Sequence, residues 1–141
     1  MKITIGSDHR GYDLKEKIKN NFIKIEWIDV GINSKTRVDY PIFSKKVCKN
    51  ILDGIVDQGI LICGSGIGMS ISANRFRGIY AALCWNAKVA AAAKEHDKAN
   101  ILVLSSDFVS QNDTFEIVKS WIESKFQGGQ HLDRLKLIDE E

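Results

Sequence analysis

The sequence lacks paired cysteines, long apolar runs and blocks of like charge. Its three cysteines, Cys48, Cys63 and Cys84, form no C-x-x-C pair, which argues against a disulfide framework and against a zinc site. No apolar stretch approaches the roughly 18 residues of a membrane span. The first residues lead directly into a strand-like segment, so we expect no signal peptide. These absences predict a protein of the reducing cytoplasm.

The bulk composition is that of a small globular protein. The chain has 141 residues, of which 44% are hydrophobic and 27% are charged, and its net charge is only +2. We therefore expect one domain, residues 1–141, with its own core. The charge is too small to indicate a nucleic-acid or acidic-membrane partner.

Strand-like and helix-like segments alternate along the chain. Runs typical of strands occupy residues 2–6, 24–30, 59–63, 79–84 and 101–104. Helical stripes occupy residues 12–22, the segment behind Pro41, residues 87–94 and a last long helix through Phe126. The pattern predicts a Rossmann-like α/β fold, a three-layer α/β/α sandwich on a five-stranded parallel sheet. In such folds the ligand lies beyond the carboxyl ends of the strands.

The pattern changes after the last long helix. Gly128 and Gly129 break that helix, and residues 130–138 form a short amphipathic tail. Its apolar positions are Leu132, Leu135 and Ile138. A helical tail this small cannot bury its own apolar face, so we expect residues 127–141 to pack on the domain or on a partner subunit.

The strongest local signal is a glycine-rich loop that follows the third strand. Its residues are Cys63, Gly64, Ser65, Gly66, Ile67 and Gly68. Backbone N–H groups of such a loop, at a helix N-terminus, can cradle a phosphate or a developing enediolate. The alternative is a tight turn without a ligand. Met69 breaks both the dinucleotide fingerprint and the arginine position of cysteine phosphatases, and no G-K-[ST] completes a P-loop.

Cys63 is the candidate base. It ends a buried strand directly before a helix N-terminus, where a thiolate is stabilised. The alternative is that Cys63 is a small core residue, which is the reading we favour for Cys48 and Cys84.

Four further polar residues are candidates for a site. Asp8 and His9 follow the first strand in a ligand-facing loop, so we expect them in the site. His96 ends the alanine-rich helix, and it is either a site residue or a cation that stabilises the helix dipole. Asp39 can act as the N-cap of the helix behind Pro41, which leaves the Tyr40 hydroxyl free to face a sugar.

Together these residues resemble the type B ribose-5-phosphate isomerases, whose family also holds the galactose-6-phosphate and allose-6-phosphate isomerases. The resemblance runs from residue 2 to about residue 137. Its marks are S-D-H-R-G at 7–11, D-Y-P at 39–41, G-I-L-I-C-G-S-G-I-G at 59–68, A-N-R-F-R-G-I at 73–79, Asn86, E-H-D-K-A-N at 95–100 and G-G-Q-H-L-D-R at 128–134. Any one of these is weak, but all of them in order are highly specific.

The resemblance implies a role for each matching residue. Cys63 matches the base that acts on carbon 2 of the open aldose, and Ser65 with the amides of Gly64 to Gly68 matches the anion hole for the enediolate. His96 matches the residue that helps to open the sugar ring. Substrate contacts are implied for Asp8, His9, Tyr40, Asp97 and the phosphate-binding Arg134. The resemblance also implies a homodimer or a dimer of dimers, with sites built from both subunits, and it implies neither cofactor nor metal.

The sequence departs from the family pattern at four positions. Asp97 stands where the family usually has asparagine, and Tyr80 replaces a common arginine. Gln130 and Asp107 stand where many members have phosphate-binding arginines. The departures leave the proton-transfer residues in place.

The expected activity is the reversible isomerisation of ribose 5-phosphate and ribulose 5-phosphate. Within the family, the alternative is an allose or galactose 6-phosphate isomerase. Cys63 favours the pentose or allose enzyme, because galactose-6-phosphate isomerase subunits tend to lack this cysteine. A phospho-sugar-binding module without catalysis is a further alternative.

Overall fold

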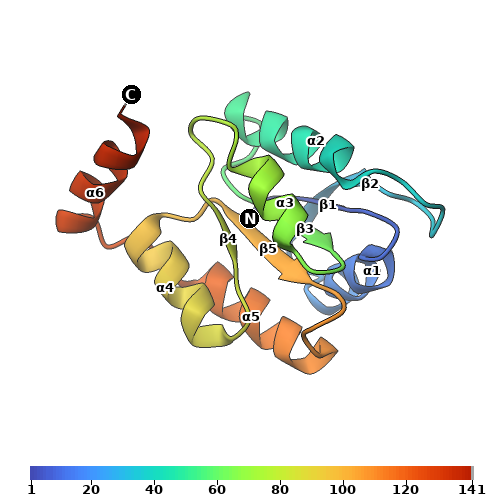
Figure 1. The fold of residues 1–141 in the computed structure, drawn as a ribbon. Coiled ribbons are helices and arrows are strands. Elements are labelled where there is room, and N and C mark those ends of the chain that lie inside the picture. The colour runs from blue at the N-terminus through green and yellow to red at the C-terminus, as the bar shows by residue number, and fades with distance from the viewer. Residues whose placement is uncertain (141) are drawn as a thin grey trace.

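Five strands alternate with six helices in the computed structural model, which describes residues 1–140 (Figure 1). The strands are β1 (Lys2–Ser7), β2 (Glu26–Gly31), β3 (Gly59–Cys63), β4 (Ala81–Leu83) and β5 (Ile101–Ser105). The helices are α1 (Tyr12–Asn21), α2 (Tyr40–Leu52), α3 (Ile67–Ala73), α4 (Ala87–Asp97), α5 (Gln111–Glu123) and α6 (Gln130–Asp139).

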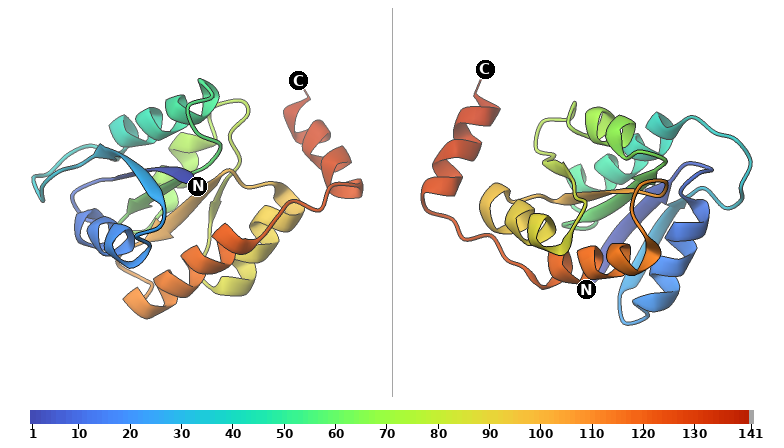
Figure 2. Two further views of the ribbon diagram at one scale, coloured as in Figure 1. Left: turned by 180° about the vertical axis from the view of Figure 1, so that it is seen from behind. Right: turned by 60° about the horizontal axis from the view of Figure 1, so that its bottom comes forward.

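The strands form one parallel sheet in the order β2-β1-β3-β5-β4. Helices α1, α4 and α5 cover one face, and α2 and α3 cover the other (Figures 1 and 2). The predicted three-layer α/β/α sandwich is therefore confirmed. Because the chain leaves β1 toward one edge of the sheet and β3 toward the other, the two strands flank a topological switch point, where such folds bind ligands.

The central strand β3 shows how the sequence sets the two cores. Ile60 and Ile62 point into the α1, α4 and α5 layer, whereas Leu61 and Cys63 point toward α2 and α3. Every residue of β3 is buried, as expected of a continuous apolar run in a parallel sheet. Each large aliphatic side chain buried in this way contributes about 1.5–3 kcal/mol to folding. The same alternation directs the Cys63 side chain to the face on which α3 begins.

A buried ammonium group, which the apolar pattern does not predict, fixes the chain after β2. Lys15 in α1 is fully buried, and its Nζ donates to both carboxylate oxygens of Asp29, at 2.8 and 2.9 Å, and to the Ile32 carbonyl. Burial acts to raise the pKa of Asp29, but hydrogen bonds from Lys15, Lys19 and the Gly31 N–H lower it overall. This network anchors the start of the segment that leads to Tyr40.

The predicted strand at residues 79–84 is shortened to three residues, because side chains replace strand partners at its start. The Asn74 side chain pairs with both the N–H and the carbonyl of Ala81, and Asn100 accepts from the Tyr80 N–H. Two asparagines of the recognised motifs are thus structural.

The predicted last helix also ends early. Helix α5 stops at Glu123, so Phe126 lies outside it. The chain then runs alongside the end of α4, where the Gln127 N–H donates to the Glu95 carbonyl at 2.9 Å. Asp39 occupies the predicted N-cap position of α2, but its side chain makes no capping hydrogen bond.

Candidate active site

Two of the predicted site residues meet at the switch point between β1 and β3. Asp8 follows β1 directly, and Cys63 is the last residue of β3; both are buried. Burial is the largest cause of the raised pKa of the Cys63 thiol, and the charge of the nearby Asp8 carboxylate raises it further. The sheet order, which the sequence could not supply, is what places these two strand ends side by side.

The Cys63 thiol lies beneath the turn that begins α3. The Gly66 N–H donates to Sγ at 3.2 Å. Burial raises the pKa of Cys63, while hydrogen bonding from the backbone N–H groups of Met69, Gly66 and Ser65 acts to lower it. The amides therefore stabilise the thiolate as expected, but in the isolated chain burial outweighs them and the pKa lies above its ordinary value.

The backbone at Cys63 is held by the end of β5, which sequence reasoning missed. The Ser106 N–H and hydroxyl both donate to the Cys63 carbonyl, at 3.0 and 3.3 Å. The Ser105 hydroxyl and the Asp107 N–H donate to the Gly64 carbonyl, at 2.7 and 3.0 Å. The only signal for these contacts was a pair of small polar residues at the end of a predicted strand. They fix the base and the first loop amide as one rigid unit.

Two positions of the glycine loop, Gly66 and Gly68, require glycine. Gly66 has φ +80°, the left-handed region that side chains rarely adopt. A Cβ on Gly68 would lie 2.6 Å from Cζ of Tyr40, so only glycine allows the Tyr40 ring to pack here. The Ser65 hydroxyl accepts from the Ile67 N–H at 3.1 Å, which leaves its own proton for a ligand oxygen. The loop thus has the shape of an anion cradle bordered by a tyrosine.

Asp8 and His9 form the second side of this site. One carboxylate oxygen of Asp8 accepts from the N–H groups of Arg10 and Gly11, at 3.0 and 3.1 Å, which shapes the turn before α1. His9 Nδ1 accepts from the Val38 N–H at 3.3 Å. In neutral His9 the ring proton therefore resides on Nε2, where it can be donated to a ligand.

Arg10 and Asp107 form an ion pair across the first part of the loop. Oδ2 of Asp107 and Nε of Arg10 would lie 2.8 and 2.9 Å from a Cβ on Gly64. Asp107 therefore brings a positive charge, that of Arg10, to the glycine loop.

The structure does not bring His96, Asp97 and Arg134 to Cys63 in the same chain. Helix α4 starts after the carboxyl end of β4, and its 11 residues extend about 16 Å back toward the amino edge of the sheet. Asn100, just beyond it, accepts from the Gly59 N–H at the start of β3. His96 and Asp97 are exposed there. The His96 ring stacks on the His131 ring, with a centroid distance of 4.6 Å, a contact that no sequence signal indicated.

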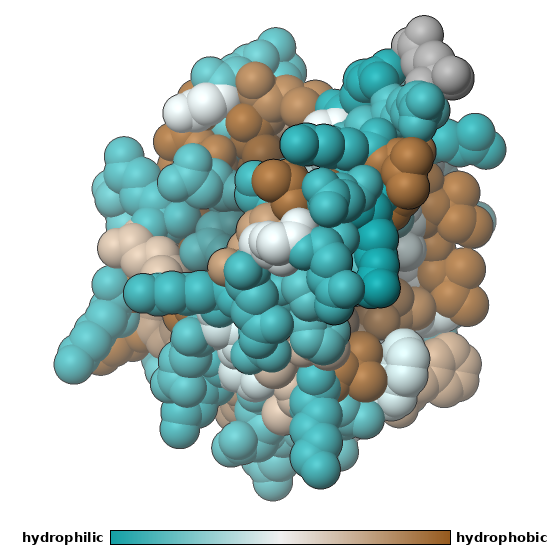
Figure 3. All heavy atoms as spheres, turned by 90° about the vertical axis from the view of Figure 1, so that its left-hand side faces the viewer, coloured by the Kyte–Doolittle hydropathy of each residue, from teal (hydrophilic) through white to brown (hydrophobic). Residues whose placement is uncertain are grey.

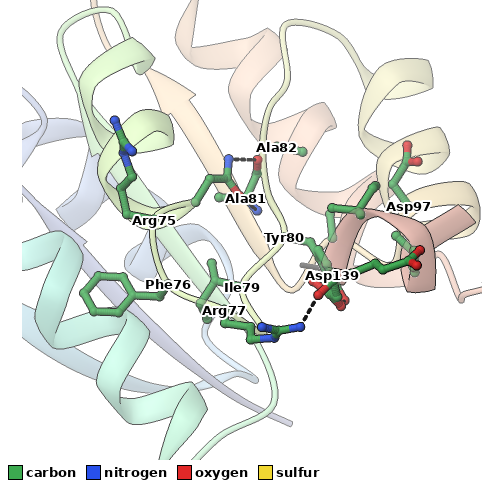
Figure 4. Close-up of a pocket in the computed structure, with 14 residues that line it drawn as sticks. Arg75, Phe76, Arg77, Ile79, Tyr80, Ala81, Ala82, Asp97 and Asp139 are labelled. Atoms are coloured by element: carbon green, nitrogen blue, oxygen red, sulfur yellow. Dashed lines mark hydrogen bonds between the residues drawn. The ribbon is translucent and has the colours of Figure 1, made fainter.

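The tail is partly docked on its own chain. Leu135 is buried, and Asp139 contacts the Tyr80 hydroxyl and the Arg77 guanidinium (Figure 4). A cavity of about 560 Å³ lies between the segment 74–82 and α6, and Asp97 lines it. The exposed apolar residues of α6 are Leu132, Leu137 and Ile138. The side of the molecule that carries α4 and α6 is largely hydrophilic in its middle, with hydrophobic side chains toward its edges (Figure 3).

Comparison with known proteins gives the family. The family described as ribose/galactose isomerase matches residues 3–138. The chain belongs to this family. A ribose-5-phosphate isomerase B of Escherichia coli is 38% identical over 97% of this chain and 93% of its own length.

Two solved structures share the family fold. A ribose 5-phosphate isomerase from Thermotoga maritima is 47% identical, with a TM-score of 0.97 over 99% of this chain and 98% of its own. A ribose-5-phosphate isomerase B from Mycoplasma genitalium, solved with bound ribulose-5-phosphate, is 38% identical, with a TM-score of 0.92 over 98% and 93% of the two chains. The likeness covers the glycine loop, α4 and the tail alike.

Residues 1–140 contain neither a cluster of metal-ligating side chains nor a helix that could span a membrane. No three histidine, cysteine, aspartate or glutamate side chains in that range come together as a metal site. None of its helices is both long and apolar enough to cross a lipid bilayer.

Proposed function

We propose that this enzyme interconverts ribose 5-phosphate and ribulose 5-phosphate through an enediolate, with Cys63 as the base. The observation that carries the proposal is the Cys63 thiol, fixed at the switch point beneath the amides of the glycine loop. Membership of the family and the bound ribulose-5-phosphate of the M. genitalium relative support the substrate. The three free thiols suit a reducing cytoplasm as the place of action.

The proton transfer follows from the position of the thiol. Cys63 Sγ, as thiolate, takes the proton from carbon 2 of the open aldose, and the electrons of that bond move to the aldehyde oxygen. A proton passes from the oxygen on carbon 2 to the oxygen on carbon 1, the bond from carbon 2 to its oxygen becomes a carbonyl, and the thiol returns its proton to carbon 1, which gives the ketose. A proton bound to carbon is weakly acidic, so its removal needs a base of high proton affinity. The Cys63 thiolate is such a base, because its pKa is raised, but only a small fraction of Cys63 is then thiolate near neutral pH.

The negative charge that develops on the substrate oxygens needs donors that are already oriented. The loop amides of Gly64 to Gly68 and the Ser65 hydroxyl form such a set next to the thiol. Asp8, His9 and Tyr40 border the same space, and we assign them to the sugar hydroxyls and, for His9, to the phosphate.

The phosphate needs cations, but Gln130 and Asp107 stand where many family members have arginines that bind it. Arg10, held over the loop by Asp107, supplies one within the chain. We expect Arg134 on the tail to supply another, because one guanidinium group can donate two parallel hydrogen bonds to phosphate oxygens. We therefore assign the phosphate to His9, Arg10 and Arg134.

We propose that a second copy of the chain completes the site. His96, Asp97 and Arg134 lie toward the amino edge and the tail, too far from Cys63 to act in the same chain. Ile67, Ile71 and Trp85 are exposed near the carboxyl edge, at 57%, 58% and 63%, and would be covered by a partner. In this homodimer His96 of one copy opens the ring of the sugar bound beside Cys63 of the other.

A side-by-side turnover assay tests the substrate assignment. The purified protein is given ribose 5-phosphate, allose 6-phosphate and galactose 6-phosphate, with and without EDTA. We expect the highest kcat/KM with ribose 5-phosphate and no effect of chelation. Faster turnover of a hexose phosphate would move the protein to the hexose enzymes, and binding without turnover would make it a binding module.

A further inference from the structure

A second cavity lies at the amino edge of the sheet, on the opposite side from Cys63. Its volume is about 530 Å³, and it lies between the end of α4 and the segment that follows α5. Three lysines line it: Lys94, Lys98 and Lys125. Asp57 is the one carboxylate among the lining residues, and within residues 1–140 none of the three ammonium groups forms an ion pair. The cavity therefore carries an excess of positive charge.

Lys94 is the deepest of the three. Its Nζ lies 4.0 Å from the ring centroid of the buried Trp121 and donates to Oε1 of Gln58 at 2.8 Å. Both partners are uncharged, so the ammonium is partly desolvated without a counter-charge, and burial lowers the pKa of Lys94 to about 8. With Oε1 engaged in this way, the Gln58 side-chain amide nitrogen remains a donor toward the cavity.

Lys98, the residue directly after α4, adds a second charge. Its Nζ lies 5.6 Å from the centroid of the Phe126 ring, which forms a wall of the cavity beside Lys125. Because Lys94, Lys98 and Lys125 line the same cavity, their like charges repel one another. An anion between them would relieve both the repulsion and the desolvation of Lys94.

We propose that this cavity binds a phosphate-type dianion, held by Lys94, Lys98 and Lys125 with the Gln58 amide as a further donor. Lysine binds phosphate as a point charge and needs no fixed geometry. The cavity is larger than a phosphate ion, so we expect its ligand to be a small metabolite that carries a phosphate group. The site is separate from the one at Cys63, whose assigned residues include no lysine.

Lysine labelling tests the proposal without interference from the active site. The protein is treated briefly with acetic anhydride at pH 8, in inorganic phosphate or in sodium chloride of equal ionic strength, and each lysine is read by peptide mass spectrometry. A dianion close to Lys94 raises the pKa of that amine, so we expect phosphate to slow its labelling about fivefold or more. The exposed Lys88, outside the cavity, should be labelled equally in both salts.

A double variant supplies the matched control. Lys98→Gln with Lys125→Gln keeps Lys94 but removes two of the three cations, and both replaced side chains are exposed. Phosphate protection of Lys94 should disappear in this variant and persist in Lys88→Gln. Equal labelling of wild-type Lys94 in phosphate and chloride would overturn the proposal, as would full protection in the double variant.

Discussion

The carboxyl edge of the sheet and the end of α4 differ in how tightly their functional residues are held. At the carboxyl edge, hydrogen bonds from Gly66, Ser105 and Ser106 fix Cys63 and its loop, and the thiol is buried. At the end of α4, His96 and Asp97 are exposed, and the His96 ring stacks on His131 of the tail. One chain therefore fixes the proposed base in place and leaves the proposed ring-opening residue exposed at the other end of the sheet.

Replacing the base should give the largest effect. Cys63→Ser should lower turnover at least ~100-fold, because general-base removal costs that much while the fold is kept. Cys84→Ala is the matched control, since Cys84 is buried in the core away from the loop. Near-normal turnover by Cys63→Ser, with ribose 5-phosphate in a coupled assay, would remove Cys63 from the chemistry.

The pH profile reports the same thiol. Because the pKa of Cys63 is raised above its ordinary value of 9.0, the active thiolate is a minority form at neutral pH. We expect kcat/KM to rise about tenfold per pH unit up to at least pH 9. A profile that levels off below pH 8 would mean that the base is another group, or that the thiolate is stabilised far more than these contacts provide.

Arg134→Ala tests whether the tail contributes to binding of the substrate phosphate. A charge-assisted hydrogen bond contributes about 1.5–3 kcal/mol, so KM should rise at least about tenfold with a smaller change in kcat. Lys136→Ala, another exposed cation of α6, should leave KM unchanged. An unchanged KM in Arg134→Ala would assign the phosphate to His9 and Arg10 alone.

His96→Asn should have the smallest and most selective effect. The aldose must open its ring before proton transfer, whereas the ketose is already open. We expect a several-fold greater loss in the ribose 5-phosphate direction than in the ribulose 5-phosphate direction, measured as initial rates. Equal losses in both directions would place His96 in the proton-transfer step or in the fold.

The sequence predicted the layers and two candidate residues that the fold brings together. Alternating patterns located the strands, and the rule that ligands lie beyond the carboxyl ends identified Asp8 and Cys63. The same topology also implies that a helix leaving that edge ends at the opposite one, so His96 could not lie beside Cys63 in one chain. The family motifs assign Cys63 and His96 to one kind of active site. The fold shows that within one chain the two residues lie at opposite edges of the sheet.

The remaining contacts join segments that are distant in sequence. Lys15 with Asp29, Arg10 with Asp107 and His96 with His131 leave no mark in local periodicity, because each depends on which elements become neighbours. The Arg10–Asp107 pair shows the consequence. In the sequence, Asp107 replaces an arginine that binds phosphate in many family members. In the structure, Asp107 forms an ion pair with Arg10 and so positions a cation from another loop.

Mixing two variants that are each impaired at a different residue tests the shared site most directly. Cys63→Ser and His96→Asn proteins are unfolded together, refolded together, and assayed with ribose 5-phosphate against each variant refolded alone. If His96 of one copy serves Cys63 of the other, half of the dimers are mixed and each has one intact site, so about a quarter of wild-type activity should return. If both residues serve the same chain's site, every site in the mixture carries a defect, and activity no higher than the average of the two variants would contradict the account.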